Sequence, residues 1–440
     1  MHIIKSSLTI VALLSVQAVG QSTENGANIY KDYNYCQGIS PVAKKTYHPI
    51  HGAKLQKVQV MMRHGDRTPA TSVLPGDHTN YNICAQPAEY TFTAASHLKH
   101  ASAYLKSNIE ISSDNLFAGS FWKGNCELGQ LTNKGSEQTR QVGAALRSIY
   151  VDELKFLSTT LNPDDLYLRN TYIWRTRESA ENFLEGLYPP SYRHSNAIVT
   201  LNTYPQIIET LILNPSACPK LGALFAGFYK TPTYLNWSQT NYAIKTKVNT
   251  VLGVTKNAAY NTTWNADTIM PRYCNKMALP CSTTDPSLCL TAADAVEAMR
   301  LSTFGYTGPF RFEAAAEEIK RLAVGPFLKT LAGGIRATIS NSSHKRVRPF
   351  EIFSAHDQSL DQVLAVIADP STPWPAYASN VIFETWKTIK HELVVRVLYE
   401  GKVVPSNPKL KCTLDACPLD IFLSFIESYV PSDIVSECSL

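Results

Sequence analysis

The chain has 440 residues, of which 44% are hydrophobic and 18% are charged, the balance of an ordinary folded protein rather than a disordered one. A chain of this length predicts one large domain with an elaboration, or two to three domains. Lysine and arginine number 41 against 36 aspartates and glutamates, so the charge gives no reason to expect a nucleic acid or an anionic membrane as a partner.

Residues 1–20 have the layout of a secretory signal peptide. A lysine near the start precedes an apolar run, and the small residues Ala18 and Gly20 predict cleavage after Gly20. The alternative is a buried N-terminal helix. The apolar run is short for a membrane span, and no later segment reaches about 18 uninterrupted apolar residues, so we predict no stable membrane insertion. We therefore expect a secreted protein.

The ten cysteines are scattered, even in number and free of C-x-x-C pairs, so they predict disulfides rather than a zinc site. Their connectivity is left open, although Cys412 and Cys417 are placed to close a small local loop. Three sequons, at Asn236, Asn261 and Asn341, are candidates for N-glycosylation on a secreted surface.

Predicted strands and helices alternate along the chain after a polar, extended leader at 21–52 that Cys36 would hold in place. The predicted strands are 54–62, 164–171, 349–357, 380–387 and 391–401. The predicted helices are 131–157, 175–189, 310–335 and 358–367. This order predicts an α/β fold, with a mixed, mostly parallel sheet flanked by helices on both faces.

Residues 190–310 differ in character, because they are rich in Asn, Thr, Pro and Tyr. We expect them to form a mostly helical cap lobe with long loops. This lobe would be inserted into an α/β catalytic domain made of residues 53–189 and 311–440.

Three predicted strands carry unusual polar residues at their carboxyl ends. In open α/β sheets, ligands bind just beyond these ends, so the residues are expected to share one cleft. They are Arg63, His64 and Arg67 after the first strand, Arg169 at the second, and His356 with Asp357 after the third.

Three arginines, two histidines and one carboxylic acid suit phosphoryl transfer. Arginine forks match phosphate oxygens, an imidazole can form a covalent phosphohistidine, and an aspartic acid can protonate the leaving alcohol. Each piece also has a structural explanation, such as a tight turn at Gly65, a solvated arginine pair, or a helix cap at Asp357. Their coincidence at equivalent strand ends favours a phosphate site.

Residues 63–69 read R-H-G-D-R-T-P, which matches the R-H-G-x-R-x-P signature of the histidine acid phosphatases, within the histidine phosphatase superfamily. His356-Asp357 matches the second motif of that family, and residues 167–189 resemble its middle segment, where an arginine after a strand contacts the phosphate. The resemblance covers roughly residues 54–430. The signature looks more like that of broad-specificity acid phosphatases than that of phytases.

This resemblance implies hydrolysis of small phosphate monoesters, without metal or cofactor, by an α/β domain with a helical cap. It makes His64 the nucleophile and Asp357 the proton donor. The phosphate ligands that it implies are Arg63, Arg67, Arg169 and His356. The chain departs from the family at 169–172, where R-N-T-Y replaces the frequent R-S-T-D, and at Gln358, where a small hydroxyl residue is common.

Other functions stay open at this point. Within the family they are a phytase, another inositol-phosphate phosphatase or a lysophosphatidate phosphatase; outside it, a non-catalytic phosphate-binding protein, a mutase-like transferase or a glycosidase. His97 and His100 lack a third metal ligand nearby, and the basic stretch 344–349 is read as a solvated loop. A monomer and a homo-oligomer are both compatible with the sequence.

Overall fold

The computed structural model describes residues 33–70, 74, 78–84, 89–93, 102–106, 109–110, 112, 114–194, 197–254, 262–339 and 348–440. The predicted signal peptide lies outside these residues, as do His97, His100, Asn261, Asn341 and most of the basic stretch 344–349.

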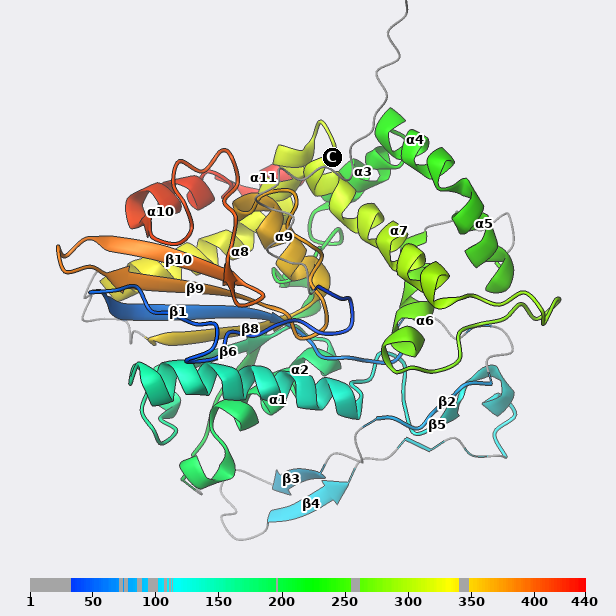
Figure 1. The fold of residues 1–440 in the computed structure, drawn as a ribbon, viewed down its shortest axis with the longest axis horizontal. Helices are drawn as coiled ribbons and strands as arrows, with labels where there is room; N and C mark the ends of the chain where they lie inside the picture. The colour runs from blue at the N-terminus through cyan, green and yellow to red at the C-terminus, as the bar shows by residue number, and fades with distance from the viewer. Residues whose placement is uncertain are drawn as a thin grey trace, which may run out of the picture.

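A mixed sheet forms the centre of the protein, in the order β11-β10-β9-β1-β8-β6-β7, with β12 paired to β10. The run from β10 through β9, β1 and β8 to β6 can be followed in Figure 1. The parallel strands are β1 (Lys54–Arg63), β8 (Phe350–Ala355), β6 (Leu166–Asn170) and β7 (Leu201–Thr203). The antiparallel part comprises β9 (Asn380–Lys387), β10 (Leu393–Tyr399), β11 (Lys402–Val403) and β12 (Cys417–Pro418). The predicted mixed, mostly parallel sheet is thus confirmed.

Helices cover both faces of this sheet, because the buried strands are apolar on both sides. On β1, Val60 and Met62 pack into the core formed with α1 and α2, whereas Met61 packs into the opposite core. One layer contains α1 (Asn133–Arg147), which continues as a π-helical segment over Ser148–Glu153, and α2 (Trp174–Leu187). The other contains α8 (Ala316–Ile339), α9 (Asp357–Ile367) and α10 (Leu419–Glu427).

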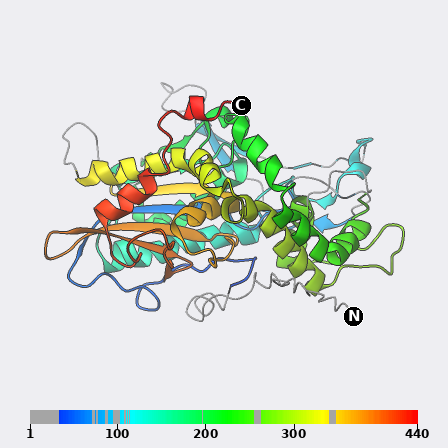
Figure 2. The ribbon, with the colours of Figure 1, turned by 90° about the horizontal axis from the view of Figure 1, so that it is seen from above.

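Between α2 and α8 the chain builds a helical region beside one end of the sheet (Figures 1 and 2). Its helices are α3 (Pro219–Phe228), α4 (Pro232–Thr240), α5 (Tyr242–Val251), α6 (Thr262–Cys274) and α7 (Ala292–Arg311). However, β7 lies within the range expected for the cap and pairs with β6 as an edge strand of the main sheet. We therefore propose that the cap lobe consists of α3–α7 and begins after β7.

All ten cysteines are paired in five disulfides. The local Cys412–Cys417 loop is confirmed, and Cys36 ties the leader to Cys274 at the end of α6. The other pairs are Cys84–Cys126, Cys218–Cys438 and Cys281–Cys289. The remaining short elements are β2 (Asn80–Tyr81), β3 (Glu89–Thr93), β4 (Ser102–Lys106), β5 (Lys123–Gly124) and α11 (Ile434–Glu437). Among the described helices, none is both long and apolar enough to cross a membrane.

Glu400, in the turn between β10 and β11, gives the fold a pH dependence. Its side chain is 3% exposed and accepts a hydrogen bond from the backbone N–H of Ile39 in the leader. Burial raises the pKa of Glu400 to about 8. A carboxyl whose pKa is raised by folding takes up a proton as the chain folds. Its contribution to stability is therefore complete below the unfolded pKa and is lost as the pH rises toward 8.

Replacing Glu400 with glutamine, which cannot ionise, is expected to remove this loss. Between pH 5 and 8 the free energy of unfolding of the unmodified protein should fall by up to about 1.4 kcal/mol per pH unit relative to Glu400→Gln. Urea unfolding at each pH measures the free energy of unfolding of the parent and of Glu400→Gln. The exposed Glu392→Gln in the β9–β10 turn is the matched control. Parallel pH profiles for the parent and Glu400→Gln would refute this assignment.

Candidate active site

The carboxyl ends of β1, β8 and β6 lie side by side, as the sequence predicted. In the register of the sheet Arg63 is opposite Ala355, and the backbone N–H of His64 donates to the carbonyl of Ala355 at 3.0 Å. On the other side of β8, the N–H of Thr171 donates to the carbonyl of Ser354 at 3.3 Å. Residues that are nearly 300 positions apart in the sequence are thus fixed at one edge of one sheet.

His64 lies at this edge with 1% of its surface exposed. Its ring Nδ1 is 2.8 Å from the carbonyl oxygen of Gly65. Because a carbonyl oxygen can only accept, Nδ1 carries the proton and Nε2 keeps a free lone pair. Burial and the nearby Arg175 hold the pKa of His64 well below its usual range. Both effects favour the neutral form of the ring.

The loop that carries His64 is pressed against the start of α1. A Cβ atom at Gly65 would lie 2.1 Å from the carbonyl oxygen of Gly135, so this close approach requires glycine. Asp66 fastens the loop from inside, since its carboxylate accepts from Thr132 Oγ1 at 2.6 Å and from Asn275 Nδ2 at 2.8 Å. The acidic residue of the motif is thus structural, and it also joins the loop to the end of α6.

A cavity of about 240 Å³ opens at the sheet edge. Its charged end is lined by His64, Arg67, Arg175, His356 and Asp357. The rings of His64 and His356 are 5.4 Å apart between centroids and meet edge to face. Four of the six residues predicted from the sequence therefore share one cavity.

Arg63 stands behind this cavity rather than in its lining. The side chain is fully buried, and its Nη2 pairs with Asp357 Oδ2 at 2.8 Å. Its Nη1 donates to the carbonyl of Pro375 at 2.9 Å, and its guanidinium carbon lies 4.1 Å from the ring centre of Tyr377. The ion pair with Arg63 therefore holds the Asp357 side chain in position.

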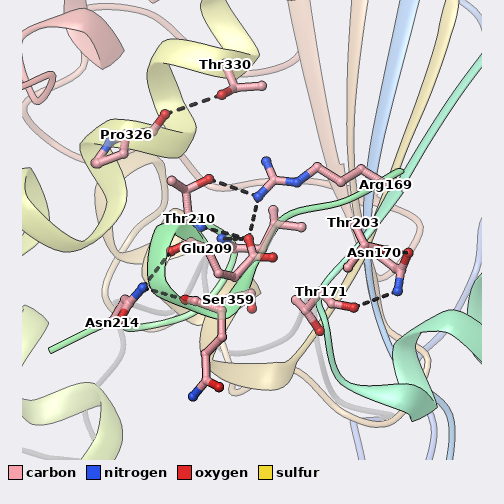
Figure 3. A network of polar contacts seen from close by, with 12 residues as sticks. Arg169, Asn170, Thr171, Thr203, Glu209, Thr210, Asn214, Pro326, Thr330 and Ser359 are labelled. Atoms are coloured by element: carbon pink, nitrogen blue, oxygen red, sulfur yellow. Dashed lines mark hydrogen bonds and ion pairs between the residues drawn. The ribbon is translucent and has the colours of Figure 1, made fainter. Parts of the chain in front are cut away.

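Arg169, predicted to contact the phosphate, is absent from the cavity lining. Its guanidinium is buried in an ion pair with Glu209 and also donates to Thr210 Oγ1 at 3.1 Å (Figure 3). The guanidinium carbon lies 3.5 Å from the ring centre of Tyr204. The arginine that reaches the cavity from this part of the chain is Arg175, in the first turn of α2. The sequence did contain a signal for Arg175. It is the first residue of the predicted helix 175–189, which follows the end of the predicted strand 164–171.

Arg67 and Arg175 are both placed to bind an anion. Their Nε atoms are buried and have no hydrogen-bond partner within the part of the chain that the structure describes. Burial and the charge of Arg67 lower the pKa of Arg175 to about 9, which leaves it charged in acid. Like charges held this close are stabilised by a bound polyanion such as phosphate.

His356 and Asp357 begin α9. His356 occupies the N-cap position, so the alternative that Asp357 caps the helix does not apply. Thr171 Oγ1 lies 3.0 Å from His356 Nε2 and 2.9 Å from Thr176 Oγ1. Although residues 169–172 depart from the family pattern, Thr171 still supplies a hydroxyl that orients His356. Burial and Arg175 lower the pKa of His356 well below its usual range.

One lining residue that the sequence did not suggest comes from α6. Asp267 pairs through Oδ1 with Arg67 Nη1 at 2.7 Å and accepts through Oδ2 from the N–H of Ala70 at 2.7 Å. These two contacts join the cap region to the loop that carries His64. No local sequence pattern identifies Asp267 as a site residue, because its partner Arg67 lies 200 positions away in the chain.

Several known proteins are similar to this chain. Counting factor 60 of Dictyostelium discoideum is 26% identical over 426 residues, which cover 94% of each chain. Lysophosphatidic acid phosphatase type 6 of Homo sapiens is 26% identical over 391 residues, covering 86% of this chain and 84% of that one. The apo structure of Hafnia alvei phytase has a TM-score of 0.57 at 16% identity, covers 89% of this chain and 100% of that one, and supports the fold alone.

A family model matches residues 54–400, which include the loop with His64, the turn with Arg175, and the pair His356-Asp357. On this match and the geometry of the sheet edge, the chain belongs to the histidine phosphatase superfamily, branch 2.

Proposed function

We propose that the protein is an acid phosphatase that hydrolyses phosphate monoesters through a covalent phosphohistidine at His64. The observation that carries the proposal is the state of the His64 ring. Its Nδ1 is occupied by the Gly65 carbonyl, and its Nε2 is free beside two arginines and a carboxyl group. A site that only bound phosphate would need the arginines but neither the oriented imidazole nor Asp357.

In the first step the Nε2 lone pair of His64 attacks phosphorus, and the bond from phosphorus to the ester oxygen breaks. Asp357, in its protonated form, gives its proton to the departing alcohol oxygen. Arg67, Arg175 and His356 bind the phosphoryl oxygens and stabilise the charge that spreads over them in the transition state.

In the second step a water molecule attacks the phosphohistidine. The Asp357 carboxylate accepts a proton from the water as the P–N bond breaks, which releases inorganic phosphate and restores neutral His64. Arg63 pairs with Asp357 at 2.8 Å and holds its carboxyl group in place for both steps. Because the first step requires Asp357 with its proton, we expect the rate to peak at acidic pH.

We further propose that the protein works outside the cytosol, as its predicted signal peptide implies. Five disulfides in one chain form and persist in oxidising compartments. Asn236, the described sequon, is exposed on α4 and accessible to glycosylation.

The proposal is tested by partitioning of the phosphoryl group. Aryl phosphates with different leaving groups are hydrolysed at acid pH, without added metal, in a fixed concentration of ethanol. A shared phosphohistidine predicts one ratio of ethyl phosphate to inorganic phosphate for every substrate, because the leaving group has departed before the acceptor attacks.

A ratio that varied with the leaving group would contradict a common intermediate. If the folded protein released no phosphate from any aryl ester yet bound inorganic phosphate in calorimetry, a phosphate-binding protein would be the better description. A pH–rate profile that peaked above neutrality would contradict the role of a protonated Asp357.

A further inference from the structure

The cavity has two chemically different ends. Beyond the charged end, the wall is mostly apolar, with side chains from the segment after β7, from α6 and α7, and from the loop before β9. The residues that form this apolar wall include Ile212, Leu213, Met270, Met299, Tyr306 and Trp374. The rings of Tyr306 and Trp374 are stacked, with centroids 5.6 Å apart. A substrate held by its phosphate at His64 would place its alcohol portion against this wall.

The charge distribution disfavours a second phosphate at the wall. Among the described residues that line the cavity, every basic side chain belongs to the charged end: His64, His356, Arg67 and Arg175. The charged residue that the cap region contributes is an acid, Asp267, and it already pairs with Arg67. Apart from apolar groups and this carboxylate, the lining beyond the charged end offers only neutral polar side chains, such as Ser302, Thr303 and Gln358. A further phosphate on the substrate would therefore lose its hydration without meeting a cation.

The segment that supplies Ile212 and Leu213 to the wall is fastened by hydrogen bonds and an ion pair. Glu209 accepts the backbone N–H groups of Thr210 and Leu211, both at 2.7 Å, and its buried charge is balanced by Arg169 (Figure 3). Asn214 follows Ile212 and Leu213 in the chain, and its Nδ2 donates to the carbonyl of Gln206 at 3.0 Å. Arg169 thus acts away from the phosphate, as a positioning residue for the wall.

We propose that this wall makes the enzyme selective for monophosphates of uncharged, apolar alcohols, such as an alkyl or acyl chain, over polyphosphorylated polyols. The inference rests on the phosphatase activity proposed above and specifies its substrate class. Each methylene that enters the cavity should raise kcat/KM about two- to fourfold until the wall is covered.

The test uses n-alkyl phosphates from methyl to decyl, with myo-inositol hexakisphosphate and an aryl phosphate alongside. We expect kcat/KM to rise with chain length and then level off, and the inositol ester to be poorer than butyl phosphate. Ile212→Ala should lower the ratio of the decyl to the methyl value. Ile207→Ala, the same change at a 68% exposed site in the same segment, should leave the ratio as it is.

A flat chain-length profile, a better rate on the inositol ester, or equal ratios in the two alanine variants would overturn the selectivity. Failure of the phosphatase proposal is distinguishable, because then the aryl phosphate is not hydrolysed either. In that event binding of n-alkyl phosphonates, which cannot be hydrolysed, still reports on the wall. Affinity that rises with chain length would support an apolar wall, and constant affinity would refute it.

Discussion

His64→Ala is expected to lower kcat/KM for an aryl phosphate by about three to six orders of magnitude, the usual loss when a covalent nucleophile is removed. The alanine has no lone pair to attack phosphorus, and a water molecule in its place lacks the fixed orientation that the Gly65 carbonyl gives the ring. The measurement is release of inorganic phosphate at acid pH, together with acid-quenched labelling of the protein by a ³²P-labelled ester.

The label should appear on the parent protein and be absent from the variant. His48→Ala, at an exposed histidine of the leader, is the matched control and should keep both activity and label. Because His64 is buried, thermal unfolding of each variant shows whether the fold persists. A folded His64→Ala protein that still took up the label would mean that another residue is the nucleophile.

The second large effect is expected at Arg175. Arg175→Ala removes one of the two guanidinium groups that line the cavity, and losing such a transition-state donor costs about 10²–10³-fold in kcat. The affinity for inorganic phosphate, measured by competitive inhibition, should fall as well. Arg177→Ala is the matched control in the same helix, where the side chain forms a surface pair with Glu181, and should change neither value.

Arg169→Gln should behave in the opposite way. It leaves the Glu209 carboxylate buried without its cation, so the free energy of unfolding should fall by about 3–5 kcal/mol. Adding Glu209→Gln should recover part of that loss, since no unpaired charge remains. In protein that stays folded, turnover of a small aryl phosphate should be affected far less than by Arg175→Ala. If Arg169→Gln lost as much activity as Arg175→Ala while its stability was unchanged, Arg169 would have to be a phosphate ligand.

The contrast between these two arginines marks the limit of prediction from the sequence. Strand ends could be located, since β1, β6 and β8 were visible as short apolar segments followed by polar residues. Parallel neighbours in a sheet then bring such ends together, which is why His64, Arg67, His356 and Asp357 could be expected to meet. The structure places all four in the lining of one cavity.

The direction in which a side chain points at the end of a strand is harder to predict from the sequence than the position of the strand end. Alternation along β6 turns Tyr167 and Arg169 toward the α8 side and Leu168 toward the α1 side. Whether Arg169 reaches a phosphate or a buried acid depends on Glu209, which lies in an irregular segment with no periodic signal. The apolar wall and Asp267 likewise depend on how the cap region packs, which local patterns do not encode.

The disulfide between Cys36 and Cys274 has a consequence for when the protein becomes active. It closes a loop across 238 positions and joins the leader next to Tyr35 to the end of the helix that carries Asp267 and Met270, all three of which line the cavity. Until that bond forms, a newly synthesised chain lacks one of the ties that bring these parts of the pocket together. On the route outside the cytosol proposed above, this bond would form only after the chain has entered an oxidising compartment, so this part of the pocket would be completed there.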